Sequence, residues 1–205
     1  MKTAHFLFLL VALAIASTAF AQGTNIYIYD QQSADESNFG EAGANVQTNQ
    51  PIGQSFIPAL ESVGFIRLCP SDDAFNGVGT TMAVNLRSDS ITGPILGSTD
   101  PVSLPDRFHG AVEFHFPTPV TVTPSVTYYF QPVIQAGESF SVSFAQFHYP
   151  NGALFGKGVA SPFFDLWFRE GIIVPEPSSA WLVLVGAGAV ASVYWRRGAG
   201  SRLQL

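Results

Sequence analysis

The chain has 205 residues and a formal net charge of −6; 47% of its residues are hydrophobic and only 12% are charged. This length suits one domain of ordinary size with short accessory segments. Nine basic residues against fifteen acidic ones leave no basic surface to neutralise phosphates, which argues against nucleic-acid binding. Two apolar runs, one near each end of the sequence, hold much of the hydrophobic content.

The first apolar run predicts a cleaved signal peptide over residues 1–21. A lysine precedes the apolar stretch 6–16, and Ala19 and Ala21 form a small-x-small cleavage site. Eleven apolar residues span about 16 Å as a helix, which is short of the ~30 Å hydrocarbon core of a bilayer. We therefore expect export, cleavage after Ala21, and Gln22 as the first residue of the processed chain.

The second apolar run predicts a transmembrane helix over residues 178–195. Residues 180–195 carry no charge, and Arg196 and Arg197 follow at once. Sixteen residues span roughly 24 Å as a helix, and the residues before them extend the span through the interface. Arginines after a span stay cytoplasmic, so we expect the preceding chain outside the inner membrane. The alternative, a buried core helix, does not explain the basic residues that follow.

A proline-rich motif stands directly before this run. Pro175, Glu176 and Pro177 give the order Pro-Glu-Pro, apolar helix, Arg-Arg. This order resembles the PEP-CTERM sorting domain of Gram-negative bacteria, which the membrane protease-transpeptidase exosortase recognises. The resemblance covers residues 174–205 and implies exosortase as a partner, with the motif and the two arginines as sorting residues. The prolines resist helix and keep the backbone extended for a protease, and a stiff spacer is the compatible alternative.

Residues 22–173 predict an all-β domain, because short alternating or apolar runs are separated by turn residues without any helical period. We expect Phe114 and Phe116 to point inward and Glu113 and His115 to point outward. The pattern favours an antiparallel β-sandwich, with a jelly roll as its form. The expected strands are 25–29, 53–57, 63–69, 81–87, 111–116, 127–134, 140–145 and 164–169.

A series of short motifs in this domain carries a second resemblance. The motifs are Gln54-Ser55-Phe56, 63–68, 84–87, 93–97, 114–116 and 127–130. In this order they resemble jelly-roll modules of bacterial secreted proteins, many of which are galactose-binding-like and bind carbohydrate. The resemblance covers about 53–170 and implies the fold more strongly than a ligand.

The domain shows no sequence signature of catalysis. It has no G-x-S-x-G, no H-E-x-x-H, no P-loop and no C-x-x-C. Cys69 is the only cysteine and is expected to be a buried thiol. His109, His115 and His148 lack metal-ligand spacing and are expected at the surface. We expect no enzyme, although fifteen acids leave a carboxylate pair for glycoside hydrolysis open.

Ligand contacts are expected in loops. Tyr149 and Asn151 join an aromatic platform to an amide, which suits sugar binding, and a turn with a half-buried tyrosine is the alternative. The acidic clusters 30–36 and 71–73 are candidates for a structural calcium ion, with solvated loops as the alternative. No other cofactor is expected, and Trp167 is expected in the core.

Together these features predict an exported protein, either anchored in the inner membrane or sorted by exosortase onto the cell surface or matrix. Its partners would be exosortase, the membrane and extracellular polysaccharide, with the domain acting as a structural or glycan-binding module. A plain membrane-anchored ectodomain without processing and a secreted hydrolase are the alternatives.

Overall fold

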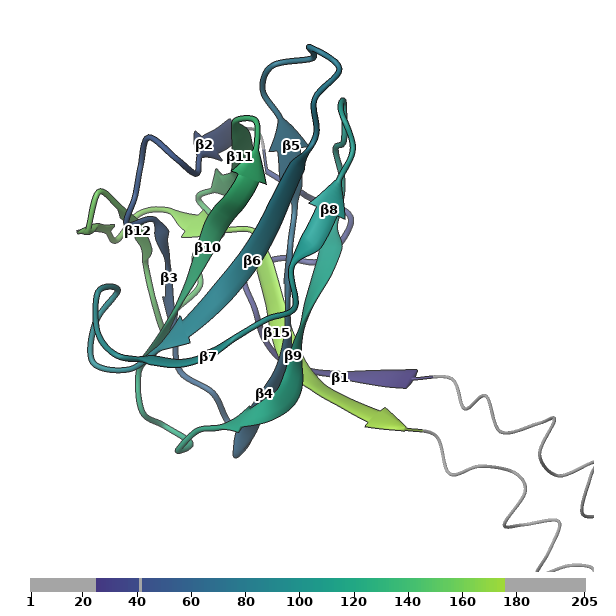
Figure 1. Cartoon of the computed structure of the whole chain (residues 1–205). Coiled ribbons are helices and arrows are strands. Elements are labelled where there is room, and N and C mark those ends of the chain that lie inside the picture. Colours follow the sequence, from purple (N-terminus) through teal and green to yellow (C-terminus); the bar gives the residue numbers. More distant parts are fainter. Residues whose placement is uncertain (1–24, 41, 176–205) are drawn as a thin grey trace, which may run out of the picture. The chain divides into compact units, whose positions relative to one another are not determined.

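A computed structural model describes residues 25–40 and 42–175 (Figure 1). The predicted signal peptide 1–21 and the predicted transmembrane helix 178–195 lie outside the described residues. So do the predicted processing residues other than Pro175. Within the described ranges, no helix is long and apolar enough to cross a membrane. The chain divides into two units, residues 27–173 and a unit made of residues 1–26 and 174–205.

Every regular element in the described residues is a strand, as the turn-rich sequence predicts. The strands are β1 Asn25–Gln32, β2 Ala42–Asn45, β3 Gly53–Phe56, β4 Ser62–Leu68, β5 Pro70–Asp72, β6 Thr80–Arg87, β7 Ile95–Ser98, β8 Val102–Leu104, β9 Val112–Thr121, β10 Tyr128–Gly137, β11 Phe140–Ala145, β12 Leu154–Gly156, β13 Val159–Ser161, β14 Asp165–Leu166 and β15 Phe168–Pro175.

Three sheets build the domain. One has the order β1-β15-β4-β9, and the largest has the order β13-β12-β3-β10-β6-β7 with β8 beside β6. The third has the order β14-β11-β2 with β5 beside β11. Figure 1 shows β6 and β10 on one side of the domain and β4, β9 and β15 on the other. This is an all-β sandwich with antiparallel sheets, and it is compatible with a jelly-roll module.

The hydrophobic core draws residues from all three sheets. Phe130 on β10 and Phe168 on β15 are fully buried, and their ring centroids are 5.2 Å apart. Phe56 on β3 joins them, with its ring 5.9 Å from that of Phe130. Burial of large rings from facing sheets provides most of the favourable free energy of folding in such a sandwich.

The inward register predicted for β9 is confirmed. Phe114 is fully buried and pairs with Ile66 of β4, and Phe116 is 6% exposed. Glu113 and His115 point to the other face, but both are half-buried rather than solvated. The outer face is covered because Tyr27 of β1 packs there and its hydroxyl lies 3.2 Å from Nε2 of His115.

The eight predicted strands are all present, with one change. The predicted strand 164–169 is interrupted at Trp167 and forms β14 and β15. Six further strands were not predicted: β2, β5, β7, β8, β12 and β13. Each has three or four residues, too few for an alternating pattern to show, and their pairing partners define them.

Candidate functional site

Tyr149, the predicted stacking platform, lies in the core, so this prediction is wrong. Its side chain is only 8% exposed, and its ring packs edge-on against Phe168 at 5.2 Å. The hydroxyl donates to Oε1 of Gln31 at 3.1 Å, and burial raises the pKa of Tyr149 to about 12. A ring with so little exposed surface offers no face on which a sugar could stack. Asn151, the other predicted contact, is exposed, but the buried ring of Tyr149 cannot serve as an aromatic platform beside it.

A buried polar cluster holds Tyr149 in this position. Nε2 of Gln54 donates to Oδ1 of Asp165 at 2.8 Å, and Oε1 of Gln54 accepts from the N–H of Leu166 at 3.0 Å. The second oxygen of Asp165 accepts from the N–H of Tyr149 at 3.0 Å. Burial raises the pKa of Asp165 above its ordinary value. Gln54 of the Gln-Ser-Phe motif therefore has a structural role, tying β3 to β14 and to the loop that carries Tyr149.

The acidic cluster 71–73 uses its oxygens to fix loops. Asp72 accepts from the N–H of Ala74 at 2.8 Å and from the N–H of Arg107 at 2.7 Å, and these bonds lower the pKa of Asp72. Asp73 accepts from the amide of Asn45 at 2.9 Å and from the hydroxyl of Ser141 at 2.8 Å. Hydrogen-bond donors of the protein therefore already bind carboxylate oxygens that a calcium ion would need as ligands.

The cluster 30–36 is likewise engaged by the protein. Asp35 accepts from the N–H and the hydroxyl of Ser37, and these bonds lower the pKa of Asp35. Glu36 pairs with Arg67 and, at 3.1 Å, with Arg169. In the described part of the chain, no three His, Cys, Asp or Glu side chains are grouped to hold a metal. The structure lends no support to the calcium prediction at either cluster.

The remaining candidate residues are dispersed. Cys69 is buried as predicted, and its burial raises the pKa of the thiol. His109 and His148 are exposed, and His115 is the half-buried partner of a tyrosine. Trp167 is fully buried as predicted, and its indole N–H donates to the backbone oxygen of Asp35 at 3.0 Å.

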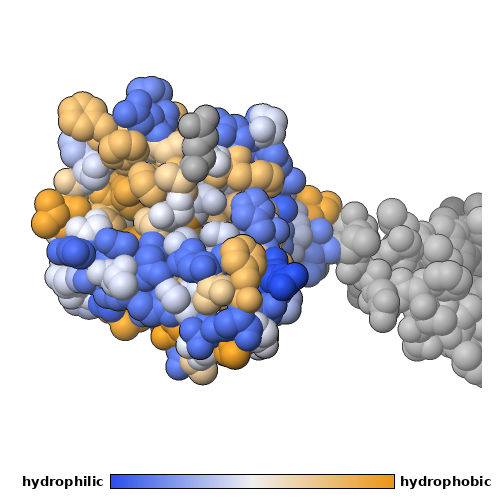
Figure 2. Space-filling model, turned by 90° about the horizontal axis from the view of Figure 1, so that it is seen from above, coloured by the Kyte–Doolittle hydropathy of each residue, from blue (hydrophilic) through white to orange (hydrophobic). Residues whose placement is uncertain are grey.

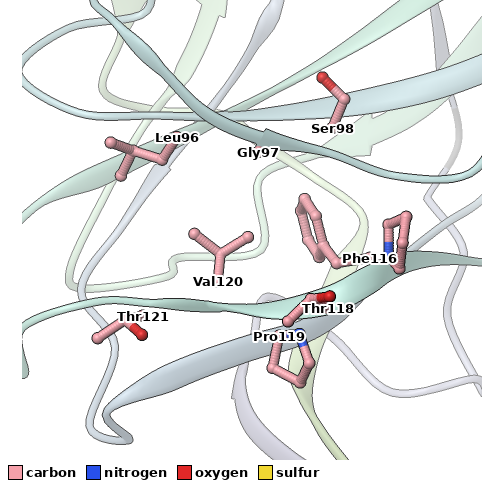
Figure 3. Close-up of a pocket in the computed structure, with 9 residues that line it drawn as sticks. Leu96, Gly97, Ser98, Phe116, Thr118, Pro119, Val120 and Thr121 are labelled. Atoms are coloured by element: carbon pink, nitrogen blue, oxygen red, sulfur yellow. The ribbon is translucent and has the colours of Figure 1, made fainter.

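A groove of about 510 Å³ lies between β7 and β9 (Figure 3). The two strands stand at the ends of different sheets, and residues 96–98 and 116–121 line the groove. These nine residues carry no charged side chain; they offer Leu96, Phe116, two prolines and Val120 beside one serine and two threonines. Figure 3 shows Phe116 and Val120 pointing into the space between the strands.

Sequence reasoning missed this groove, because it did not predict β7 and ended the β9 strand at Phe116. The alternation Pro117-Thr118-Pro119 was an available signal, since proline is confined to the edges of sheets. Gly97 permits the close approach of the strands. A Cβ at this position would lie 2.6 Å from Cγ2 of Val120. The groove therefore depends on a small residue on one strand and a β-branched residue on the other.

The segment leading into the Pro-Glu-Pro motif is a strand. β15 runs to Pro175 and lies between β1 and β4 in its sheet. The backbone is thus extended up to the first proline of the motif, as the conformational preferences of proline predict. The remainder of the motif and the arginines lie outside the described residues.

Comparison with known families decides what this segment is. Residues 174–198 match the PEP-CTERM protein-sorting motif. The match begins at the residue where the sequence analysis placed the tail and includes Pro175, Glu176, Pro177, Arg196 and Arg197. A search of curated proteins returned no match. The PEP-CTERM motif implies that this protein is exported, processed by exosortase and sorted to the cell surface.

Proposed function

We propose that the β-sandwich of this exosortase-sorted protein binds a neutral extracellular polysaccharide in the groove between β7 and β9, as a surface or matrix module. One observation carries the proposal: the groove is open, uncharged and mixed in polarity. Sugar rings present apolar C–H faces and a rim of hydroxyls. The exposed Leu96 and the two exposed prolines would contact the faces, and the serine and threonine hydroxyls would bond the rim.

The groove suits binding rather than catalysis. Hydrolysis of a glycoside needs two carboxyl groups beside the scissile bond, and the nine lining residues include none. The hydroxyl of Ser98 donates to Oδ1 of Asn85 at 2.7 Å, so it is paired with an amide and not with a base that could activate it. We infer a binding module that is not an enzyme.

Charge favours a neutral polymer over a polyanion. Between residues 22 and 174 the sequence has five basic and fourteen acidic residues. Such a domain repels a polyanion at low ionic strength unless cations bridge the two. Before processing, the apolar run 178–195 would hold the protein in the inner membrane with the sandwich outside, and processing would then release it to the surface or matrix.

Electrophoresis of the purified protein through gels containing host polysaccharide tests the proposal. We expect retardation of the unaltered protein and loss of retardation in Leu96→Asp, which places a charge in the groove. Val159→Asp is the matched control, because Val159 is also exposed but lies on β13. If polysaccharide does not change the migration of the unaltered protein, with or without calcium, the proposal is wrong. Equal retardation of both variants would assign binding to another surface.

A further inference from the structure

Glu170 is a buried acid without a partner. It lies on β15 beside Ile66 of β4, and none of its surface is exposed. Neither carboxyl oxygen accepts a hydrogen bond from a donor among the described residues. A carboxylate in this position would lose its hydration and gain nothing in return, which disfavours the charged form strongly.

Asp30 on the neighbouring strand β1 is the acid whose charge raises the pKa of Glu170. Unlike Glu170, Asp30 accepts hydrogen bonds from the protein. Oδ2 of Asp30 accepts from the N–H groups of Ala59 at 2.7 Å and Leu60 at 3.0 Å, and Oδ1 accepts from Nε2 of Gln31 at 3.2 Å. Three N–H donors therefore hold the Asp30 carboxyl group in place. Glu170 has no such donor, so its burial favours the protonated form.

No described cation offsets this pair. Arg169, the residue before Glu170, points to the opposite face, where its guanidinium lies 3.6 Å from the ring centroid of Tyr29 and pairs with Glu36. Arg67 of β4 is also on that face and pairs with Glu36 and Glu113. Strand alternation keeps both guanidinium groups away from Glu170.

The other ionisable group near the pair is Tyr149, from the loop before β12. Its hydroxyl donates to Gln31 and is neutral over the physiological range, because burial raises its pKa to about 12. The charge of Asp165 contributes to the raised pKa of Tyr149. The two oxygens of Asp165 accept hydrogen bonds from the side-chain amide of Gln54 and from the N–H of Tyr149. Tyr149 therefore brings no positive charge to Glu170, and Asp30 is the charged group that shifts the titration of Glu170.

These surroundings shift the titration of Glu170. Burial is the largest cause, and the neighbouring Asp30 adds to it by its charge and as the acceptor for a protonated Glu170; together they raise the pKa of Glu170 to about 9. The backbone of Gln31 opposes the shift without making a hydrogen bond of normal geometry. A protonated Glu170 has a hydroxyl to donate to Asp30, so one proton satisfies both acids.

We propose that Asp30 and Glu170 share a proton between β1 and β15, and that this pair makes the docking of β1 on the strand that leads into the sorting motif depend on pH. Loss of the proton leaves a buried charge on Glu170 beside the half-buried carboxyl group of Asp30, and β1 is the element that can leave, because it is at the edge of its sheet. The inference is independent of polysaccharide binding.

The sign of the pH dependence follows from the raised pKa. The folded protein holds the Glu170 proton up to about pH 9, whereas the unfolded chain releases it near the ordinary value of 4.5. Between these limits the folded state binds more protons, so stability falls as the pH rises. Each pH unit inside the window increases the unfolding equilibrium constant by up to about tenfold.

Urea unfolding of the purified protein between pH 5 and 9 tests the proposal. We expect the midpoint of the unaltered protein to fall with pH, and Glu170→Gln to show a nearly flat profile, because glutamine donates to Asp30 without titrating. Asp165→Asn is the matched control for a buried acid with a raised pKa, and it should keep most of the slope. An unchanged slope in Glu170→Gln would overturn the proposal.

A second variant and a second readout keep the test decisive. Asp30→Asn should move the upper end of the window to lower pH, because Glu170 loses its like-charged neighbour; an unmoved window would count against the pair. Hydrogen exchange at the Ala59 and Leu60 amides should accelerate with pH beyond the intrinsic increase in the unaltered protein but not in Glu170→Gln. If calcium chloride stabilises the unaltered protein at pH 8 and not Glu170→Gln, the pair binds a cation instead, and proton sharing is wrong.

Discussion

The side-chain amide of Gln54 donates a 2.8 Å hydrogen bond to Asp165, and both residues are buried. The two lie 111 positions apart in the sequence. The bond joins β3, at the heart of the largest sheet, to β14 of the third sheet. It also fixes the loop of Tyr149, since the other oxygen of Asp165 accepts from the Tyr149 N–H. One amide thus connects two sheets and closes one region of the core.

Replacing Gln54 by leucine should destabilise the domain. The change leaves Oδ1 of Asp165 and the N–H of Leu166 without partners in a buried site, which costs about 1–3 kcal/mol. Gln146→Leu is the matched control, because Gln146 is exposed, and it should change the unfolding free energy by less than about 0.5 kcal/mol. Urea unfolding at pH 7 measures both. Similar effects at the two positions would show that the Gln54 cluster does not stabilise the fold.

Phe114→Ala should be severe and Glu113→Ala mild. Phe114 is fully buried, so truncation creates a cavity and costs about 3–5 kcal/mol. Glu113 is half-buried and pairs with Nε of Arg67 at 3.1 Å, so its loss should cost about 0.5–1 kcal/mol. Thermal and urea unfolding of the two variants give the comparison. A Glu113 variant as unstable as the Phe114 variant would contradict the observed register.

Gly97→Ala should widen the groove at a cost in stability. The new Cβ would lie 2.6 Å from Cγ2 of Val120, so either the Val120 side chain or one of the two edge strands must shift. We expect a loss of about 1–3 kcal/mol, typical of overpacking. Val120→Ala in the same protein should recover part of it, because it removes the clashing methyl. A double-mutant cycle by unfolding measures this coupling, and purely additive losses would show that the two positions do not touch.

Processing by exosortase should remove the apolar run. In a host with exosortase, we expect the mass of the mature protein to exclude residues 181–205. Replacing Pro175 and Pro177 by alanine should cause retention in the inner membrane, because alanine permits the helix to continue through the motif. Intact-mass measurement and membrane fractionation give the readouts. A mature product that keeps residues 181–205 in such a host would contradict processing at this motif.

Local patterns in the sequence were enough to predict eight strand segments and the direction of the side chains in β9. Alternation has a period of two, so Phe114 and Glu113 could be assigned to opposite faces without knowledge of any partner strand. The sorting motif was equally readable, because its order of Pro-Glu-Pro, apolar run and arginines is continuous in the chain. Both are properties of neighbouring residues.

The burial of individual side chains and their contact partners in the fold could not be predicted in this way. Tyr149 looked like an exposed loop residue, yet its loop folds onto the core because Asp165 holds it. The groove exists only where β7 and β9, the end strands of two sheets, meet at Gly97 and Val120. Asp30 and Glu170 come from strands 140 positions apart by their residue numbers, and their shared acidity appears only when β1 lies beside β15. Burial and charge coupling depend on which distant segments pack together, and no local pattern encodes that contact.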